Sequence, residues 1–388
     1  MTIHNDGPEL GGDADASGAA DVGAALANAT ALHDKLSQAV SLAGGSQAPG
    51  STDAGTDTGV VADRLAASVV RPLSDALAAL TGTSPQPVVD GPPPQSDAQR
   101  GDERRWEESL WNLARQVTAL AVRPGAPTQV AEAAAALQDL VWRVSPAEDP
   151  DGWDARLVEL NQLQTQAAPM IRVAMNGPYL LTGVARMTNW LGEDMAVRPQ
   201  MALCRCGASA INPLCDGTHA GIGFAAARDP GRVADRRDTY VGQQVSVLDN
   251  RGTCQHSGYC ADRLATVFHL GAKPFVTPSG GRMDEIIRAV RDCPSGALSY
   301  AIDGREAREQ VDYDSHREPR IEVSKDGPYR VVGGIALVDG DGNDEVRNDG
   351  ASLEHYALCR CGHSQNKPFC SGMHWHVDFH APGSLPRR

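Results

Sequence analysis

The sequence has no long hydrophobic segment, no excess of positive charge and no cysteine outside three short motifs. A transmembrane helix needs about 18 or more consecutive apolar residues, and the chain contains no such run. The formal net charge is -14, and a negative chain is repelled by nucleic acid and by anionic lipid. We therefore expect neither nucleic acid nor a membrane as a partner.

Targeting and nucleotide-binding motifs are absent as well. Residues 1–23 are rich in Gly, Ala and Asp and have neither the basic n-region nor the apolar h-region of a secretory signal. The sequence contains no Gly-rich phosphate loop, no Gly-x-Ser-x-Gly elbow and no dinucleotide fingerprint. These absences predict a cytoplasmic bacterial protein that does not itself bind NADPH or flavin.

All nine cysteines lie in three short motifs, and two of these are near copies, CRCGASAINPLCDGTH and CRCGHSQNKPFCSGMH. The first copy contains Cys204, Cys206, Cys215 and His219, and the second contains Cys359, Cys361, Cys370 and His374. Every thiol thus belongs to a motif with the spacing of metal ligands. The simplest interpretation is a metal-binding chain without disulfides.

The two copies belong to a longer internal repeat. IRVAMNGPYLLTG from Ile171 aligns with IEVSKDGPYRVVG from Ile321, and each copy then continues to ALCRCG. Alternating apolar residues on either side of Gly-Pro-Tyr predict a strand, a turn and a second strand. We therefore expect each repeat to be a small β unit that presents a cysteine-rich loop.

The ligand spacing favours iron over zinc. Two thiolates separated by one residue can bind one iron, whereas Cys215 and His219 stand at i and i+4. Pro213 and Asp216 favour a helix that starts here and places that Cys and His on one face. Two pairs of ligands suit a 2Fe-2S cluster. A structural zinc site is the alternative, although zinc fingers usually show Cys-x2-Cys, and ordinary buried cysteines are disfavoured because a complete quartet occurs twice.

At these residues the chain resembles the CDGSH iron-sulfur (mitoNEET-like) family, and NGPYLLTG and KDGPYRVVG extend the resemblance upstream. The resemblance implies one 2Fe-2S cluster with Cys204, Cys206, Cys215 and His219 as ligands, and a second with Cys359, Cys361, Cys370 and His374. It also implies that the two repeats pack on each other within the chain, as in single-chain members of the family.

The second repeat departs from the family signature at Ser371, which stands where the first repeat has Asp216. Serine can still cap the helix that carries His374, but a negative charge near the iron is lost. A unit charge at about 6 Å is worth about 2 to 3 kcal/mol at an effective dielectric near 20. We therefore expect the second cluster to have the higher reduction potential. Histidine ligands can also take up a proton and release iron, which predicts labile, pH-sensitive clusters.

A third motif, GTCQHSGYC followed by DCPSGALSY, lies between the repeats. Single-cluster ferredoxins use Cys-x2-Cys-x2-Cys and a remote Cys-Pro, and Cys254, Cys260 and Cys293 occupy the outer and remote positions. The central position is Ser257. The expected cofactor is therefore a 3Fe-4S cluster, or a 4Fe-4S cluster with His256 or Ser257 as its remaining ligand.

The segment from about residue 240 to residue 303 closely resembles the divergent single-cluster ferredoxin family, in which CxHxGxC, a helix and CPSGAL recur. Apolar residues at helical spacing predict that residues 282–291 form the helix leading to Cys293. Three structural thiols in a small fold are the alternative.

The remaining part of the chain, residues 22–168, contains no cysteine. Apolar residues recur there at helical spacing, for example at Trp106, Leu110, Leu113 and Val117, and predict four or five helices. An iron site of the ferritin type would use Glu-x-x-His pairs, which this segment lacks. We therefore expect a helical bundle that serves packing or interaction.

Together these patterns predict an α+β multidomain chain: an all-α helical bundle, then two small β-rich CDGSH-type units that flank an α/β ferredoxin-like insert. The expected boundaries are a disordered N-terminus at 1–21, the bundle at 22–168, the first repeat at 169–228, the insert at 238–304 and the second repeat at 319–383. The names first repeat, insert and second repeat are used below for these ranges.

The predicted function is one-electron transfer or redox sensing, with redox proteins as partners. Storage of clusters, or their delivery to apo iron-sulfur proteins, is the alternative. A third hypothesis is a redox enzyme that binds its substrate in the helical domain. We expect an electron carrier or cluster donor rather than an enzyme.

Overall fold

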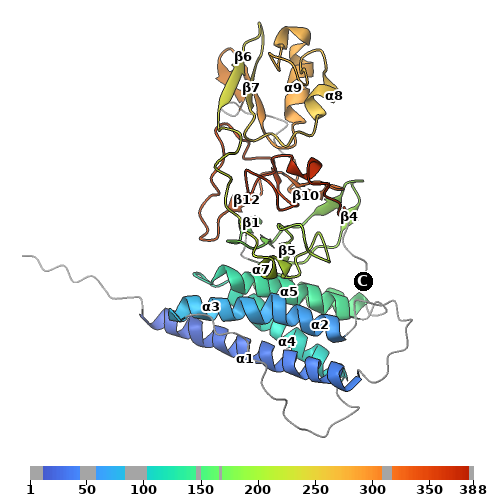
Figure 1. Cartoon of the computed structure of the whole chain (residues 1–388). Coiled ribbons are helices and arrows are strands. Elements are labelled where there is room, and N and C mark those ends of the chain that lie inside the picture. Colours follow the sequence, from blue (N-terminus) through green and yellow to red (C-terminus); the bar gives the residue numbers. More distant parts are fainter. Residues whose placement is uncertain are drawn as a thin grey trace, which may run out of the picture. The chain divides into compact units, whose positions relative to one another are not determined.

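The computed structural model describes residues 12–43, 58–83, 103–145, 150–165, 168–307 and 317–383. The chain divides into two compact units: a helical unit up to residue 167 with the short segment 198–202, and a strand-rich unit formed by residues 168–197 and 203–387. The protein is therefore α+β, with an N-terminal helical region and β-rich central and C-terminal regions (Figure 1).

The helical unit contains α1 (Gly12–Ala43), α2 (Thr58–Leu65), the π-helical turn η1 (Ala66–Val70), α3 (Arg71–Thr81), α4 (Glu103–Ala121), α5 (Thr128–Val144) and α6 (Pro150–Gln164). Buried apolar residues of these helices meet in a common core that includes Leu73, Leu110 and Leu137. α5 is buried on nearly all sides. Of the segment predicted to be disordered, residues 1–11 lie outside the described residues. Gly12–Asp21 already belong to α1, so that segment does not extend to residue 21.

A charged cluster lies at the edge of this core. The carboxylate of Asp139 contacts Arg64 at 2.8 Å, Arg143 at 2.8 Å and Arg198 at 2.7 Å. Burial opposes its ionisation, but the three arginines outweigh burial and hold the pKa of Asp139 well below its usual range. Among the described residues, no helix is both long and apolar enough to cross a membrane.

In the strand-rich unit, each repeat begins with the predicted antiparallel strand pair. β1 (Met170–Val173) pairs with β2 (Tyr179–Thr182), with Ile171 opposite Leu181. β10 (Arg320–Val323) pairs with β11 (Tyr329–Val332), with Ile321 opposite Val331. The strand, turn and strand expected in each repeat are therefore confirmed.

Each repeat also contributes one strand to the sheet of the other. β12 (Ala336–Val338) of the second repeat runs parallel to β1, and β3 (Met187–Asn189) of the first repeat runs parallel to β10. β4 (Asp194–Met195) and β13 (Tyr356–Leu358) lie at the two edges of the sheet β13-β11-β10-β3-β4. β5 (Gln200–Leu203) leads into the first cysteine motif. The two sheets are consequently interlocked by exchanged strands.

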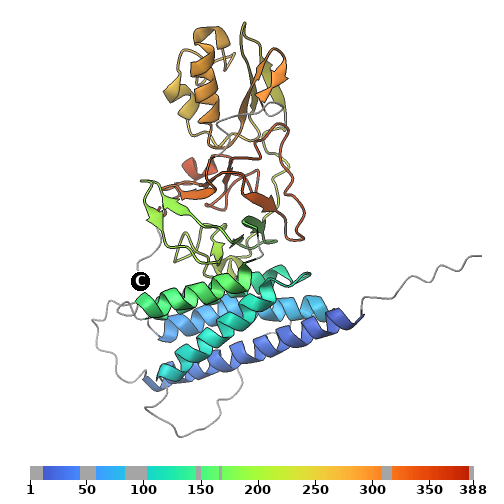
Figure 2. The same cartoon turned by 180° about the vertical axis from the view of Figure 1, so that it is seen from behind.

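The insert is an antiparallel sheet covered by helices (Figures 1 and 2). Its strands follow one another in the order β6 (Arg237–Tyr240), β7 (Ser246–Asn250), β8 (Leu298–Ile302) and β9 (Arg305–Glu306). Its helices are α8 (Tyr259–Arg263), the 3-10 helix η2 (Pro278–Gly280) and α9 (Met283–Arg291). The predicted helix before Cys293 is confirmed as α9, whose Ile286, Ala289 and Val290 enter the core.

Candidate metal centres

In the first repeat, the four predicted ligands lie in two close pairs. Cys204 Sγ is 3.7 Å from Cys206 Sγ, and Cys215 Sγ is 3.4 Å from His219 Nδ1. All four residues are at most 8% exposed. The second repeat has the same arrangement. Two pairs of ligands in one loop match the donor set of a binuclear cluster, with one pair for each metal.

In the second repeat, Cys359 Sγ is 3.9 Å from Cys361 Sγ, and Cys370 Sγ is 3.5 Å from His374 Nδ1. These four residues are at most 5% exposed. Among the described residues, no group of three or more His, Cys, Asp or Glu side chains is close enough to surround a single metal ion. The ligand role of the two quartets therefore stays a prediction.

The backbone between Cys and His is different from the predicted single helix. α7 (Thr218–Gly221) starts only after Gly217, whose φ is +88°, and the 3-10 helix η4 (Met373–Trp375) starts after Gly372, whose φ is +80°. A left-handed residue cannot continue a right-handed helix, and glycine adopts this conformation at low cost. The cysteine thus precedes the helix, and the prediction of one shared helix face is wrong.

Asp216 and Ser371 hold the ligand loop in the two repeats. Asp216 accepts hydrogen bonds from the backbone N–H of Ala210 at 2.8 Å and of Thr218 at 3.0 Å. The hydroxyl of Ser371 accepts a bond from the N–H of Gln365 at 3.1 Å. In both repeats the side chain thus accepts a hydrogen bond from the backbone N–H six residues upstream. Ser371 preserves the loop contact, while the charge of Asp216 is lost.

The pKa shifts favour the metal-binding form at only some of the predicted ligands. Hydrogen bonding with Cys206 raises the pKa of Cys204, hydrogen bonding with Cys359 raises that of Cys361, and burial raises that of Cys370. A hydrogen bond from the thiol of Cys204 lowers the pKa of Cys206 to about 7, and one from Cys361 lowers the pKa of Cys359 to about 6. Burial, followed by nearby positive charge, lowers the pKa of His374 to about 4. Thiolate and neutral imidazole are the forms that coordinate metals.

The three cysteines of the insert come from separate segments and line one small cavity. Cys254 follows β7, Cys260 lies on α8 and Cys293 follows α9. Ser257 also lines this cavity, whereas His256 is exposed and its ring faces Gly372 of the second repeat. Of the two residues predicted as the remaining ligand, Ser257 is therefore the better placed.

Sequence reasoning did not identify Asp249, which lines the same cavity. Its side chain is 1% exposed, and neither carboxylate oxygen accepts a hydrogen bond from a residue that the structure describes. Burial raises the pKa of this carboxyl to about 6. The available signal was strand alternation, because Asp249 stands two residues after Val247 and so points to the same inner face.

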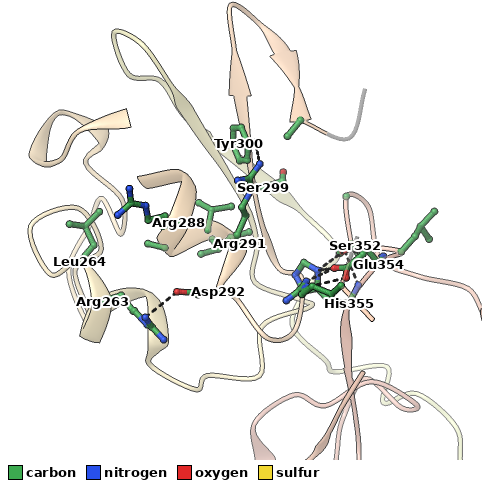
Figure 3. Close-up of a pocket in the computed structure, with 18 of the residues that line it drawn as sticks. Arg263, Leu264, Arg288, Arg291, Asp292, Ser299, Tyr300, Ser352, Glu354 and His355 are labelled. Atoms are coloured by element: carbon green, nitrogen blue, oxygen red, sulfur yellow. Dashed lines mark hydrogen bonds and ion pairs between the residues drawn. The ribbon is translucent and has the colours of Figure 1, made fainter. Parts of the chain in front are cut away.

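A larger cavity of about 840 Å³ lies between the insert and the second repeat (Figure 3). Arg263 and Arg291 of the insert line it from one side, and Ser352 and His355 of the second repeat line it from the other. Leu298 lines both this cavity and the cavity at the three cysteines. The larger cavity therefore lies against the predicted metal site of the insert.

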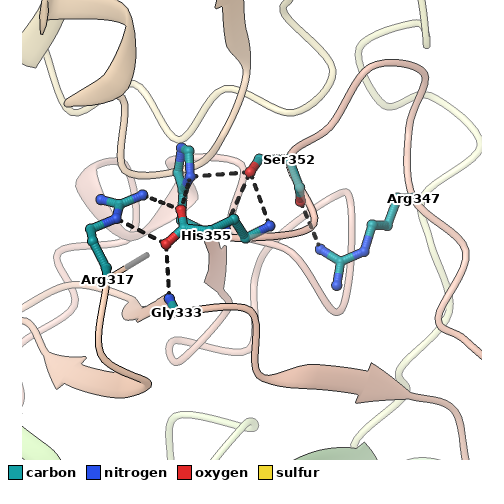
Figure 4. Close-up of polar contacts among 6 residues, drawn as sticks. Arg317, Gly333, Arg347, Ser352 and His355 are labelled. Carbon is teal, nitrogen blue, oxygen red and sulfur yellow. Dashed lines mark hydrogen bonds and ion pairs between the residues drawn. The ribbon is translucent and has the colours of Figure 1, made fainter. Parts of the chain in front are cut away.

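The polar residues of the second repeat at this cavity form a structural network (Figure 4). Nδ1 of His355 lies 2.7 Å from Glu354 Oε2 and 3.1 Å from Ser352 Oγ. Because both contacts use the same nitrogen, His355 cannot relay a proton from Ser352 to Glu354. Burial opposes ionisation of Glu354, but bonds from His355, Arg317 and the N–H of Gly333 lower its pKa to about 2. The network is not a nucleophilic triad.

Comparisons with known proteins agree with the motif positions. The family model for iron-binding zinc finger of the CDGSH type matches residues 176–220 and 326–375, and the model for a divergent 4Fe-4S mono-cluster matches residues 240–303. The uncharacterized protein YjdI of Escherichia coli K12 and that of E. coli O157:H7 are each 36% identical over 61 residues, which is 16% of this chain and 80% of YjdI. No solved structure matches the chain.

Proposed function

The chain belongs to the CDGSH-type iron-binding family, and on that premise we propose that it transfers single electrons among three iron-sulfur sites. The quartets of the first and second repeats would each hold a 2Fe-2S cluster. Cys254, Cys260 and Cys293 would hold a 4Fe-4S cluster with a non-cysteine ligand; the description of the matching family favours this type over 3Fe-4S. Bound clusters would supply one-electron chemistry at these positions.

The observation that carries this proposal is the direct backbone contact between ligand loops. Gly207 follows the Cys-x-Cys pair of the first repeat, and a Cβ there would lie 2.5 Å from the carbonyl oxygen of Cys361. A Cβ on Gly362 would overlap the carbonyl of Cys206 in the same way. Only glycine permits so close an approach, so the two loops lie back to back.

Two tyrosines hold these loops from the opposite repeat. The hydroxyl of Tyr179 donates toward the carbonyls of Cys359 and Pro368, at 3.0 and 2.8 Å. The hydroxyl of Tyr329 donates toward the carbonyls of Cys204 and Pro213, at 2.9 and 3.0 Å. Each loop is thus fixed by a side chain from the other repeat, and the spacing between the two sites is rigid.

The second repeat also contacts the ligand loop of the insert. A Cβ on Gly372, between Cys370 and His374, would lie 2.9 Å from the carbonyl oxygen of Gln255. Arg330 donates to the hydroxyl of Tyr259 at 3.0 Å. The second repeat therefore touches both other ligand loops, which supports a route in the order first repeat, second repeat, insert.

With clusters bound, each transfer along this route would oxidise one site by one electron and reduce the next by one, with no bond broken and no proton required. An external redox protein, such as a reduced flavoprotein, would supply the electron, and a second redox protein would accept it. Burial of both quartets favours this function over cluster delivery, because delivery would require the fixed loops to open.

Electron paramagnetic resonance of the dithionite-reduced chain tests the route. Cys215→Ser removes the site of the first repeat, so that only the sites of the second repeat and the insert remain. Cys370→Ser removes the site of the second repeat, so that only those of the first repeat and the insert remain. Each variant is compared with and without Cys293→Ser. In the Cys215→Ser chain, removing the insert site should lower several-fold the microwave power that saturates the signal of the second repeat. In the Cys370→Ser chain, the power that saturates the signal of the first repeat should change little. The reason is that dipolar relaxation falls steeply with the distance between two sites.

Equal changes in the two chains would contradict the order of the sites. Zinc in place of iron would contradict the iron-sulfur assignment itself. Transfer of intact clusters to an apo-ferredoxin, without unfolding of the donor, would favour delivery over electron transfer.

A further inference from the structure

The insert provides three thiolates, and a four-iron cluster needs a fourth ligand. Four residues that line the cavity at these cysteines carry side-chain oxygens: Asp249, Ser257, Tyr259 and Ser295. The hydroxyl of Tyr259 accepts a bond from Arg330 and that of Ser295 contacts the thiol of Cys293, so Asp249 and Ser257 are the candidates. The identity of this ligand rests on the proposed iron-sulfur function. The experiment below distinguishes a wrong ligand from a wrong function.

Asp249 has the properties of a ligand that lacks its metal. It lies on β7, opposite Leu298 of β8, and its side chain points to the inner face with that of Val247. The side chain is 1% exposed, and no described residue donates a hydrogen bond to either oxygen. A carboxylate buried in this way is costly unless a cation or donors compensate for it.

Arg251 offers a structural alternative for this carboxylate. Its Nε lies 3.4 Å from Asp249 Oδ2, and its Nη1 lies 3.7 Å from Cys254 Sγ. Arg251 is 36% exposed and its guanidinium lies over the ring of Phe275, so it covers the site from the solvent side. The ion pair reaches only one carboxylate oxygen, and the other remains directed to the interior.

Ser257 is the weaker candidate on chemical grounds. Its hydroxyl must lose a proton before it binds iron as an anion, whereas a carboxylate is already an anionic oxygen donor. Ser257 is also partly exposed, while Asp249 is buried. His256, the other predicted ligand, faces the second repeat.

We propose that Asp249 is the fourth, non-cysteine ligand of the iron-sulfur site in the insert. Its carboxylate would take the role that the central cysteine has in ordinary single-cluster ferredoxins, and it lines the cavity from the strand β7 and not from the cysteine loop. This explains why the loop carries Ser257 at the central position and still forms a four-ligand site.

The test compares Asp249→Asn with Ser257→Ala and His256→Ala in the full-length chain, reconstituted without oxygen. The matched control is Asp238→Asn, because Asp238 stands opposite Asp249 in the β6–β7 pair but is 40% exposed. Iron and sulfide are counted per chain, and the oxidised protein is examined by electron paramagnetic resonance. An oxidised 4Fe-4S cluster is silent, whereas an oxidised 3Fe-4S cluster gives a signal.

Asp249→Asn should lose one iron per chain and gain the 3Fe-4S signal, while the other three variants retain the iron content and the silent state. Asp249→Cys should restore the fourth iron. Full retention of iron in Asp249→Asn, or the 3Fe-4S signal in Ser257→Ala or His256→Ala, would overturn the assignment.

If Asp249→Asn loses the whole insert cluster, the Asp249→Cys variant decides between the two explanations. Recovery of the cluster would support a ligand at this position, because a thiolate there can bind the iron. Failure to recover it would overturn the assignment. Absence of iron from the unmodified chain would instead overturn the proposed function.

Discussion

At the scale of single residues, the two repeats differ most clearly at Asp216 and Ser371. Both side chains accept a hydrogen bond from the backbone six residues upstream, so the ligand loop is held in either case. The charge is what distinguishes them. A carboxylate close to iron disfavours the added electron, and this effect acts over several ångströms.

Asp216→Ser should therefore raise the reduction potential of the first-repeat site by tens of millivolts, less than the unscreened estimate because water reaches this side chain. Ser371→Asp is the matched reverse change and should lower the potential of the second-repeat site. Potentiometric titration followed by visible absorption measures both. Shifts of the same sign in the two variants would show that loop geometry, and not charge, sets the potential.

At the scale of structural elements, the exchanged strands and the crossed tyrosines couple the two repeats. Tyr179 stands at the start of β2 but supports the second cysteine loop, and Tyr329 stands at the start of β11 but supports the first. Both side chains are fully buried. A substitution of the tyrosine in one repeat should consequently change the stability of the metal site in the other repeat.

Tyr179→Phe should speed the loss of iron from the second repeat, and Tyr329→Phe should speed its loss from the first. Each change removes the hydroxyl bond to one buried cysteine carbonyl, at a cost of about 1 to 3 kcal/mol, whereas the proline carbonyl keeps its bond from the N–H of Cys359 or Cys204. The rate is followed by bleaching with a ferrous chelator, in chains that keep one quartet through Cys215→Ser or Cys370→Ser. The two tyrosine variants are controls for each other, and faster loss from the substituted repeat itself would refute the crossed support.

At the scale of the whole molecule, the chain has two compact units with cores of their own. Charges buried in the helical unit should therefore affect the stability of that unit alone. Glu132 on α5 is such a group: burial raises its pKa from 4.5 to about 7, against an ion pair with Arg71 at 3.3 Å.

The folded state thus binds the proton of Glu132 more tightly than the unfolded state. Stability is full below pH 4.5 and falls as the pH rises towards 7. Glu132→Gln should remove this dependence and stabilise the helical unit by about 1 to 3 kcal/mol at pH 7.5, with little change at pH 4.5. Denaturant unfolding followed by helical circular dichroism measures the effect. Asp21→Asn is the control, because Asp21 is a half-exposed carboxylate of the same unit that pairs with Arg123 and not with Arg71. A gain from Glu132→Gln that is equal at both pH values would count against the titration.

Local patterns accounted for much of the protein. The spacing of cysteine and histidine identified the three motifs. Alternating apolar residues predicted the strand pairs β1–β2 and β10–β11, and apolar residues at helical spacing predicted α9. Each of these predictions depends on residues that are close together in the chain. The predicted helix that joins Cys and His was wrong, because Gly217 and Gly372 have a positive φ. The spacing of the ligands does not indicate the backbone conformation between them.

Only the tertiary structure decided the rest. Strand exchange between the repeats and the contact of Gly372 with Gln255 join residues far apart in sequence, and no local pattern encodes such contacts. Asp249 shows the difference most clearly: no motif contains it, and only the fold places its strand β7 at the cavity that Cys254, Cys260 and Cys293 line. The sequence by itself indicated candidate ligands through their residue types and spacing, and packing determined which side chains meet, because donor chemistry is a property of single side chains whereas proximity is a property of the fold.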